Sequence, residues 1–522
     1  MSPRTYLFWV NIIARPILCW STTRRPGPDA TQYRHLFTQT VDHTHHSFDK
    51  RSVYGLHFLH LKADFPNYSP WNDWSKMTDE GWYGSAAIQH FLIGSWFLPG
   101  SFNPAVAMPV WPLILSMWFG LTGVGMVSAR TLTLSSVWSV PGISVSHPHR
   151  TKIMAEHALD SACPGRPAHD GQSICYAFDR LAVLEPVMAF WLVLGLWLAG
   201  RTRATDLGSQ IGLGIILFLL VLTKTTGLFL VPALLYQLSA TIGWTRRMWI
   251  RPVAIAASTA LILWLTYYSL LVRPHYLEDY RLLFTINQYR VHLSIVPQIA
   301  FETLRDGMWI NRVLFPAAFV VLLLSVVWLR ELWRQPLFGS SVIATVGYLS
   351  FIFYHSNFQP RYYLVVTMPV SIILLFGLES LWEQRRQLGG VMAAAIAFAI
   401  VTMTAQTIRY VMRPQYSLAD AADAIASQMR ADPGSKQTLL SSSGPDISLL
   451  SGIHSLSAEY NTHGLDALLD QYKPNWYAGW IGWEDEGTAT LRRRYRLEEK
   501  ARYTVFDDPR RQTLVLYRME PR

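Results

Sequence analysis

Long apolar segments follow one another through most of this 522-residue chain. A transmembrane helix needs about 20 predominantly apolar residues. Nine segments approach or reach that length: 105–128, 181–199, 208–222, 226–242, 253–272, 313–329, 340–354, 364–382 and 390–412. Two weaker segments, 6–20 and 131–146, are interrupted by Arg15 and Pro141. The pattern predicts a multi-pass α-helical membrane protein with about nine to eleven helices. The 15% of charged residues agrees, since soluble proteins average about 25%.

Arginines occupy the short joints between these apolar segments. They are Arg201, Arg203, Arg246, Arg247, Arg251, Arg330, Arg334, Arg385 and Arg386. Such residues concentrate on the cytoplasmic side of a membrane. If these joints are cytoplasmic, the charged residues expected together on the outer side are Asp79, Glu80, Arg180, Glu185, Lys224 and Arg361. The net charge of +10 is therefore a topology signal, and we expect no nucleic-acid partner.

The composition changes to that of a soluble domain after the last apolar segment. We expect a helix over 417–429 with Ser417 as its N-cap, and a second helix at GLDALLDQY. Strands are predicted at QTLLSS and NWYAGWIGW, and a hairpin-like pair at ARYTVFDD and QTLVLYRM. Residues 413–522 are thus predicted to form a small extracytoplasmic α/β domain.

The remaining boundaries follow from the apolar pattern. Residues 1–70 form an N-terminal segment with a weak first helix and a polar, His-rich stretch, DHTHHSF. That stretch is either a disordered loop, which its composition favours, or a zinc site. Residues 71–104 are the first extracytoplasmic loop, and 105–412 the transmembrane domain. Residues 141–174 break the apolar pattern. They are either an outer loop or a stretch in which the reading frame has slipped. Within them, Cys163 would either pair with Cys175 or stay a free thiol.

Two adjacent carboxylates, Asp79 and Glu80, lie in WNDWSKMTDEGWYG, just before the first long apolar segment. Neighbouring residues of a helix point in different directions. The pair therefore suits one acid acting as a base while the other binds a metal or an oriented group. The alternative is a helix-start pair favoured by the helix dipole, with Thr78 as N-cap.

Charged residues also interrupt the apolar segments. Lys224 lies within LFLLVLTKTTGLFLVP, where a charge costs roughly 2.5–3.5 kcal/mol on insertion scales. It is either a phosphate ligand or a hairpin tip whose amine reaches the interface. Arg361 precedes a helix on the outer side, against the usual charge bias. It is either a phosphate ligand, which its planar fork suits, or an Arg-Tyr anchor at the membrane interface. Arg180 and Glu185 form either an intrahelical ion pair or the polar wall of an outer cavity.

Five segments together resemble the GT-C superfamily of integral-membrane glycosyltransferases. In order they are TDEGWYGSAAIQHFLIGSW, NPAVAMPVWPLI, AFDRLAVLEPVMAFWLVLGLWL, GIILFLLVLTKTTGLFLVPALL and QPRYYLVVTMPVSIILL. The resemblance is greatest to family 39, which holds the protein O-mannosyltransferases and the lipid A aminoarabinose transferases. It covers roughly residues 70–412, with a gap at 131–175.

The resemblance implies transfer of a sugar from a polyprenyl-phosphate donor at the outer face of the membrane. Asp79 then matches the catalytic base and Glu80 its partner, while His90 falls in the helix that follows. Lys224 and Arg361 are basic positions for the donor phosphate. The C-terminal domain is similar to the extracytoplasmic appendage of bacterial members, which implies a bacterial inner membrane.

The predicted reaction is an inverting transfer to the hydroxyl of a lipid, protein or glycan acceptor. A divalent metal at Glu80 is left open, and no other cofactor is expected. Segments 1–70 and 131–175 depart from the family pattern, so a catalytically impaired relative is one alternative. A lipid or sugar transporter is another, although the chain shows no internal repeat.

Overall fold

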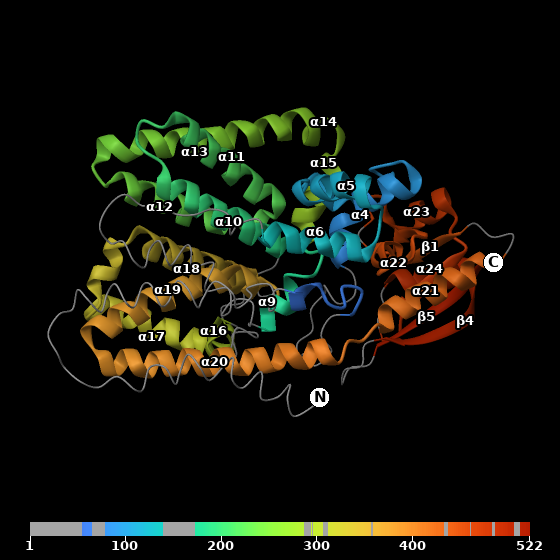
Figure 1. The fold of residues 1–522 in the computed structure, drawn as a ribbon. Coiled ribbons are helices and arrows are strands. Elements are labelled where there is room, and N and C mark those ends of the chain that lie inside the picture. The colour runs from blue at the N-terminus through green and yellow to red at the C-terminus, as the bar shows by residue number, and fades with distance from the viewer. Residues whose placement is uncertain are drawn as a thin grey trace, which may run out of the picture. The chain divides into compact units, whose positions relative to one another are not determined.

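The computed structural model describes residues 55–64, 79–138, 173–286, 294, 296–305, 312–355, 359–432, 437–459, 461–482, 486–505 and 512–522 (Figure 1). The chain divides into two units, Met1–Ser52 and Val53–Arg522, and the elements below belong to the second. The predictions for segment 6–20, the His-rich stretch, Thr78 and Cys163 lie outside the described residues.

Helices make up the larger part of the described chain. They are α4 (Asp79–Ile93), α5 (Val110–Thr122), α6 (Met126–Trp138), α9 (Ser173–Phe178), α10 (Leu184–Arg201), α11 (Leu207–Thr223), η5 (Thr225–Leu230), α12 (Val231–Ile242), α13 (Arg246–Tyr267), α14 (Arg273–His275), α15 (Leu277–Ile286), α16 (Val296–Arg305), α17 (Leu314–Val327), α18 (Pro336–His355), α19 (Tyr362–Gln384) and α20 (Arg386–Met412). Short 3₁₀ turns lie at Leu56–Phe58, Pro104–Val106 and Arg330–Arg334, and a π-helical turn at Tyr268–Val272.

Six helical stretches among the described residues are long and apolar enough to cross a membrane. They are Leu184–Arg201, Thr225–Ile242, Met248–His275, Pro336–Tyr354, Tyr362–Gln384 and Arg386–Arg430. The bent pair of α5 and α6 would make a seventh, and α11 and α17 are shorter apolar helices. These helices follow the predicted apolar segments. A long apolar segment is stable in a bilayer only as a helix, because there its backbone N–H and C=O groups form hydrogen bonds with one another.

The predicted single helix over 105–128 is wrong. Helix α5 ends at Gly123, and α6 leaves it at an angle of 117°. Gly123 has a φ of +78°, a conformation that costs glycine little and other residues more. An apolar run alone does not reveal such a bend. The bend redirects α6, so that Arg130 lies beside α4.

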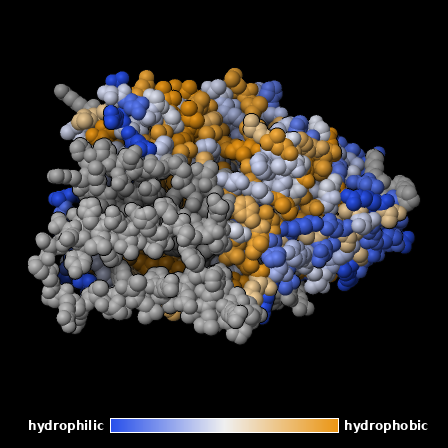
Figure 2. Space-filling view, in the orientation of Figure 1, coloured by the Kyte–Doolittle hydropathy of each residue, from blue (hydrophilic) through white to orange (hydrophobic). Residues whose placement is uncertain are grey.

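The transmembrane helices pack around α19, most of whose side chains are buried. Helix α18 packs against both α19 and α12, and α10 packs against α11 (Figure 1). Large apolar side chains such as Met117, Leu121 and Val391 are exposed. Figure 2 shows apolar residues across the visible helical surface and mainly hydrophilic ones over the C-terminal sheet region. This distribution suits helices that face lipid.

The C-terminal region contains one five-stranded sheet with the order β2-β1-β3-β5-β4. Its strands are β1 (Thr438–Ser441), β2 (His454–Ser457), β3 (Trp476–Trp480), β4 (Tyr495–Val505) and β5 (Gln512–Pro521). Strand β1 is parallel to β2 and β3, whereas β5 is antiparallel to β3 and β4. The helices are α21 (Ser417–Arg430), α22 (Gly444–Ser451), α23 (Gly464–Tyr472) and α24 (Glu486–Arg494). The predicted α/β class is confirmed, although the sequence analysis missed α22, β2 and α24.

The start of α21 differs from its prediction, because its N-cap is Tyr416 and not Ser417. Asp64, far away in the sequence, takes over the capping function. Its carboxylate accepts from the Ser417 hydroxyl at 2.6 Å and from the Leu418 N–H at 3.2 Å. Burial raises the pKa of the Asp64 carboxyl, and these hydrogen bonds oppose that shift. Residues 55–64 are thereby tied to the C-terminal region.

Candidate functional site

Asp79, Glu185, Lys224 and Arg361 form one buried cluster. Arg361 forms an ion pair with Asp79, and its Nε lies 3.4 Å from Oε1 of Glu185. Lys224 Nζ donates to the same Glu185 oxygen at 2.5 Å. None of the four residues is more than 8% exposed. The structure thus brings together four of the charged residues for which the sequence predicted the same side of the membrane.

Each member of this cluster leaves the backbone at a helix end. Asp79 opens α4, and Glu185 lies in the first turn of α10. Lys224 adopts an extended conformation between α11 and η5. Arg361 is the N-cap residue of α19. A side chain in the middle of a helix would point into the bundle or toward the lipid, whereas side chains at helix ends can meet one another. A polar site therefore forms among apolar helices.

Two tyrosines enclose the cations of this cluster. Lys224 Nζ lies 4.5 Å from the ring centroid of Tyr362 and 5.8 Å from that of Tyr83. The Arg361 guanidinium lies 5.3 Å from the Tyr362 ring. Aromatic faces attract cations electrostatically, and more strongly where water is excluded. The rings therefore hold the two positive charges close together without adding negative charge.

Glu80 is held by Arg130, which the sequence analysis did not single out. Arg130 Nε donates to Oε1 of Glu80 at 2.8 Å and Nη2 donates to Oε2 at 2.5 Å. The backbone N–H of Ala182 donates to Oε1 as well, at 2.7 Å. The signal that would have revealed Arg130 is the one that revealed Lys224: a charge inside the apolar sequence VSARTLTL.

The surroundings of Glu80 do not fit a metal site. Both of its oxygens accept hydrogen bonds from a buried cation. Within the described part of the chain, no three side chains of His, Cys, Asp or Glu converge to hold an ion. Divalent ions such as Mg²⁺ and Ca²⁺ require several oxygen ligands. The arrangement instead gives Glu80 the geometry of a group that anchors the start of α4.

Arg180 and His90 lie apart from the buried cluster. Arg180 donates to the Tyr176 hydroxyl at 2.6 Å and to the His60 carbonyl, and forms no ion pair with Glu185. His90 stacks on Trp96 with ring centroids 5.2 Å apart. It lies eleven residues after Asp79 on α4, about 16 Å along the helix at 1.5 Å per residue. The geometry therefore supports neither residue as a direct ligand beside Asp79.

A cavity of about 770 Å³ adjoins the cluster. Apolar and aromatic side chains form most of its wall, among them Phe218, Leu228, Trp264, Phe284, Phe351 and Tyr354. Lys224 is the charged residue among the described residues that line it, and Tyr83 and Tyr362 line the same end. Small-molecule sites commonly have this volume and this combination of apolar wall and few polar groups. The arrangement suits a ligand with a long apolar chain and an anionic head.

No family model matches the sequence, and no curated protein matches it. Among the solved structures that match, two cover nearly the whole of both chains. The apo structure of ArnT, an aminoarabinose transferase, from Cupriavidus metallidurans has a TM-score of 0.55 at 13% identity, covering 93% of this chain and 98% of ArnT. The structure of that protein bound to undecaprenyl phosphate has a TM-score of 0.53 at 13% identity, covering 94% and 98%. The predicted fold is confirmed: this is an integral membrane protein with a GT-C-like fold and a small C-terminal α/β region.

Proposed function

We propose that this protein is a glycosyltransferase that moves a sugar from a polyprenyl-phosphate donor to an acceptor hydroxyl. The observation that carries this proposal is the junction between the apolar cavity and the buried pair of cations, Lys224 and Arg361. The matched structure of ArnT bound to undecaprenyl phosphate supports this class of donor. We place the reaction at the outer face of the membrane, following the arginine distribution, and in a bacterial inner membrane, following the resemblance of the C-terminal domain to that of bacterial family members.

The cavity and the cations suit the two parts of the donor. The isoprenoid chain would lie against the apolar wall, with its phosphate beside Lys224. Lys224 and Arg361 are balanced by Glu185 and Asp79, so the four formal charges sum to zero. An arriving phosphate would compete with Glu185 for both cations. Charge-assisted hydrogen bonds to phosphate are strong in a site from which water is excluded.

The proposed reaction is a single displacement at the anomeric carbon. The Asp79 carboxylate takes the proton of the acceptor hydroxyl, whose oxygen forms a bond to that carbon. The bond between the carbon and the donor phosphate oxygen breaks, and polyprenyl phosphate leaves with the electron pair. The configuration inverts. Lys224 and Arg361 stabilise the charge on the leaving phosphate, while Glu80, held by Arg130, keeps the start of α4 in place.

The completeness of this cluster supports an active enzyme over an impaired relative. All four charges of the site are present, buried and paired among the described residues. Buried ion pairs that serve no purpose would be costly to keep, because desolvation often exceeds the Coulombic gain. A transporter would need access from both sides of the membrane, whereas the charges here gather at helix ends on one predicted side.

The test is transfer of a radiolabelled sugar from a panel of polyprenyl-phosphate sugars to membrane acceptors by the purified protein. Asp79→Asn is expected to lower the transfer rate about 10²- to 10⁴-fold, the usual contribution of a general base. Asp420→Asn, at an exposed acid of α21, is the control and should transfer like the wild type. Undiminished transfer by Asp79→Asn would exclude that residue as the base. Absence of wild-type transfer from every donor would reject the function.

A further inference from the structure

The C-terminal α/β region touches the helix that carries Asp79 and Glu80. Gly81, the next residue of α4, lies against the start of α22. A Cβ atom at Gly81 would lie 2.2 Å from the carbonyl carbon of Pro445 and 2.3 Å from the backbone nitrogen of Asp446. Both obstacles are backbone atoms, which a side-chain rotation cannot move. The contact therefore requires glycine at this position.

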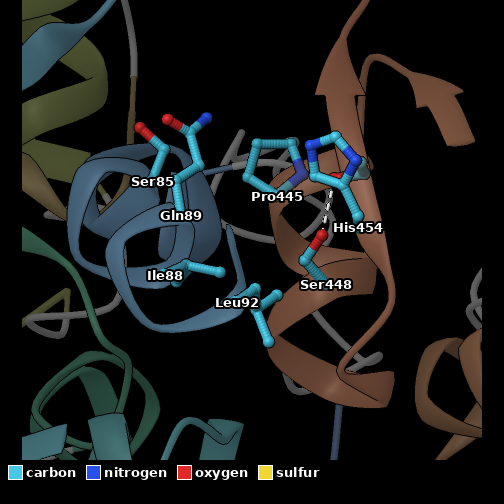
Figure 3. Close-up of a pocket in the computed structure, with 8 residues that line it drawn as sticks. Ser85, Ile88, Gln89, Leu92, Pro445, Ser448 and His454 are labelled. Atoms are coloured by element: carbon cyan, nitrogen blue, oxygen red, sulfur yellow. Dashed lines mark hydrogen bonds between the residues drawn. The ribbon is translucent and has the colours of Figure 1, made fainter. Parts of the chain in front are cut away.

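The interface continues along both helices. Figure 3 shows Ser85, Gln89 and Leu92 of α4 on one side, and Pro445 and Ser448 of α22 with His454 of β2 on the other. The gap between them is only about 10 Å³, about the smallest space that holds one water molecule. The two helices are thus packed closely, and a displacement of α22 would be transmitted to the first turn of α4.

One polar contact lies at the centre of this interface. The Gly81 N–H donates a hydrogen bond to the Asp446 carboxyl group. Asp446 is only 1% exposed, and its Oδ2 has no hydrogen-bond partner among the described residues. The first four N–H groups of an α-helix have no acceptor within the helix. Asp446 supplies one of those acceptors from the C-terminal region, as a helix cap contributed across the fold.

The raised pKa of the Asp446 carboxyl group agrees with its role as a cap of α4. Burial and the neighbouring Glu80 and Asp79 carboxylates raise the pKa of Asp446 well above its ordinary value, and Arg130 opposes them only in part. A neutral carboxyl group still offers a carbonyl oxygen to the Gly81 N–H. It also adds no third negative charge beside Asp79 and Glu80.

We propose that Asp446 is a positioning residue that caps α4 through Gly81 and so holds Asp79 and Glu80 in their ion pairs. This inference rests on the proposed transferase function, because it assigns the C-terminal region a role in the geometry of that reaction. If α4 shifted, Asp79 would move from Arg361, and Glu80 from both Arg130 and Ala182. Docking of the C-terminal region is therefore a condition for a competent site.

The experiment compares Asp446→Ala with Asp446→Asn in the full chain. Loss of a helix cap corresponds to about a 5-fold change in a local equilibrium. Asp446→Ala should therefore raise amide hydrogen exchange of residues 79–84 about 5-fold. It should lower kcat about 10-fold and leave the KM for donor within about 2-fold. Asp446→Asn keeps an oxygen acceptor of the same size and should restore both exchange and kcat.

Matched glycine variants separate docking from general damage. Gly81→Ala introduces the clash with the backbone of α22 and should raise exchange in both helices. Gly84→Ala, one turn later on α4, meets the flexible end of Leu115 at 2.8 Å and should leave exchange in α22 unchanged. Size-exclusion profiles identify any variant that does not fold. In that case the exchange and kcat of Asp446→Asn, compared with those of the wild type, decide whether the proposal holds.

Two results would overturn the proposal. One is unchanged exchange and kcat in Asp446→Ala. The other is an Asp446→Asn variant as impaired as Asp446→Ala, which would mean that charge and not capping matters. If no variant, including the wild type, transfers sugar but exchange still responds as expected, the proposed function fails while the docking role stands. The two failures are therefore distinguishable.

Discussion

Arg130 holds the carboxylate of Glu80 with two hydrogen bonds, of 2.8 and 2.5 Å, from 50 positions further along the chain. The same guanidinium donates to the Leu61 carbonyl at 2.7 Å. This bidentate pair joins α4, α6 and the segment 55–64, and both side chains are 3–4% exposed. Glu80 is thereby fixed, and Asp79 beside it is directed toward Arg361. The two adjacent acids have different partners, which explains how they share one helix start.

Arg130→Met should strongly destabilise the protein. Removing one partner of a buried pair leaves the other charge uncompensated, at a cost of about 3–5 kcal/mol. The measurement is the thermal unfolding midpoint in detergent. Arg334→Met is the control: its pair with Glu331 is 78% and 66% exposed and should contribute at most about 1 kcal/mol. Adding Glu80→Gln to Arg130→Met should recover part of the loss, and equal midpoints for all variants would contradict the prediction.

Lys224→Met should weaken the binding of polyprenyl phosphate at least about 10-fold, since a charge-assisted hydrogen bond contributes roughly 1.5–3 kcal/mol. Lys224→Arg keeps the charge and should lose less. Binding of a fluorescent polyprenyl phosphate to the purified protein measures the effect. Lys62→Met removes an exposed lysine paired with Asp423 and should bind like the wild type. If Lys224→Met binds equally well, the phosphate does not lie at this end of the cavity.

Ala260→Trp should obstruct the apolar cavity that Ala260 lines. We expect at least about a 10-fold higher KM for a long-chain donor and a smaller change for a ten-carbon donor, because the shorter chain buries less apolar area. Transfer assays with donors of graded chain length provide the measurement. Ala254→Trp, at an exposed position on the same helix, is the matched control. Equal effects on short and long donors would place the lipid chain elsewhere.

Docking of the C-terminal region should depend on pH through Asp446. Its pKa in the folded protein is raised above the ordinary 3.8, mainly by burial. Its stabilising contribution is therefore fully present below about pH 3.8 and is lost as the pH rises through the raised folded value. The groups that face it are Asp79, Glu80 and Arg130.

The measurement is the exchange protection factor of residues 79–84, corrected for the intrinsic pH dependence of exchange. In the wild type, protection should fall as the pH is raised from about 3.8 through the raised folded pKa of Asp446. In Asp446→Asn, which cannot ionise at this position, the protection should stay constant over the same range. A wild-type profile that matches the Asp446→Asn profile would show that Asp446 does not titrate in the docked state.

The charges of the site could be found in the sequence because charges are conspicuous in apolar surroundings. Lys224, Arg361, Glu185 and Asp79 each interrupt or border an apolar run, where a buried charge is costly and so points to a partner. Arg130 has the same signal, but the bend at Gly123 that brings it to Glu80 is a matter of backbone conformation. His90 was expected in the site because it follows the acids on the same helix, and Arg180 because it lies with Glu185 at the start of an apolar segment, but their side chains contact Trp96 and Tyr176 instead.

The sequence by itself determined the apolar helices and the α/β class of the C-terminal region, because these follow from local composition and periodicity. Only the tertiary structure decided which charge meets which. The pairs Arg361–Asp79, Lys224–Glu185 and Arg130–Glu80 join different helices, and Asp446 reaches Gly81 from the C-terminal region. Such partners depend on how helices cross and bend, and on backbone contacts that only glycine allows. Helix packing sets these relationships, and local sequence carries no record of them.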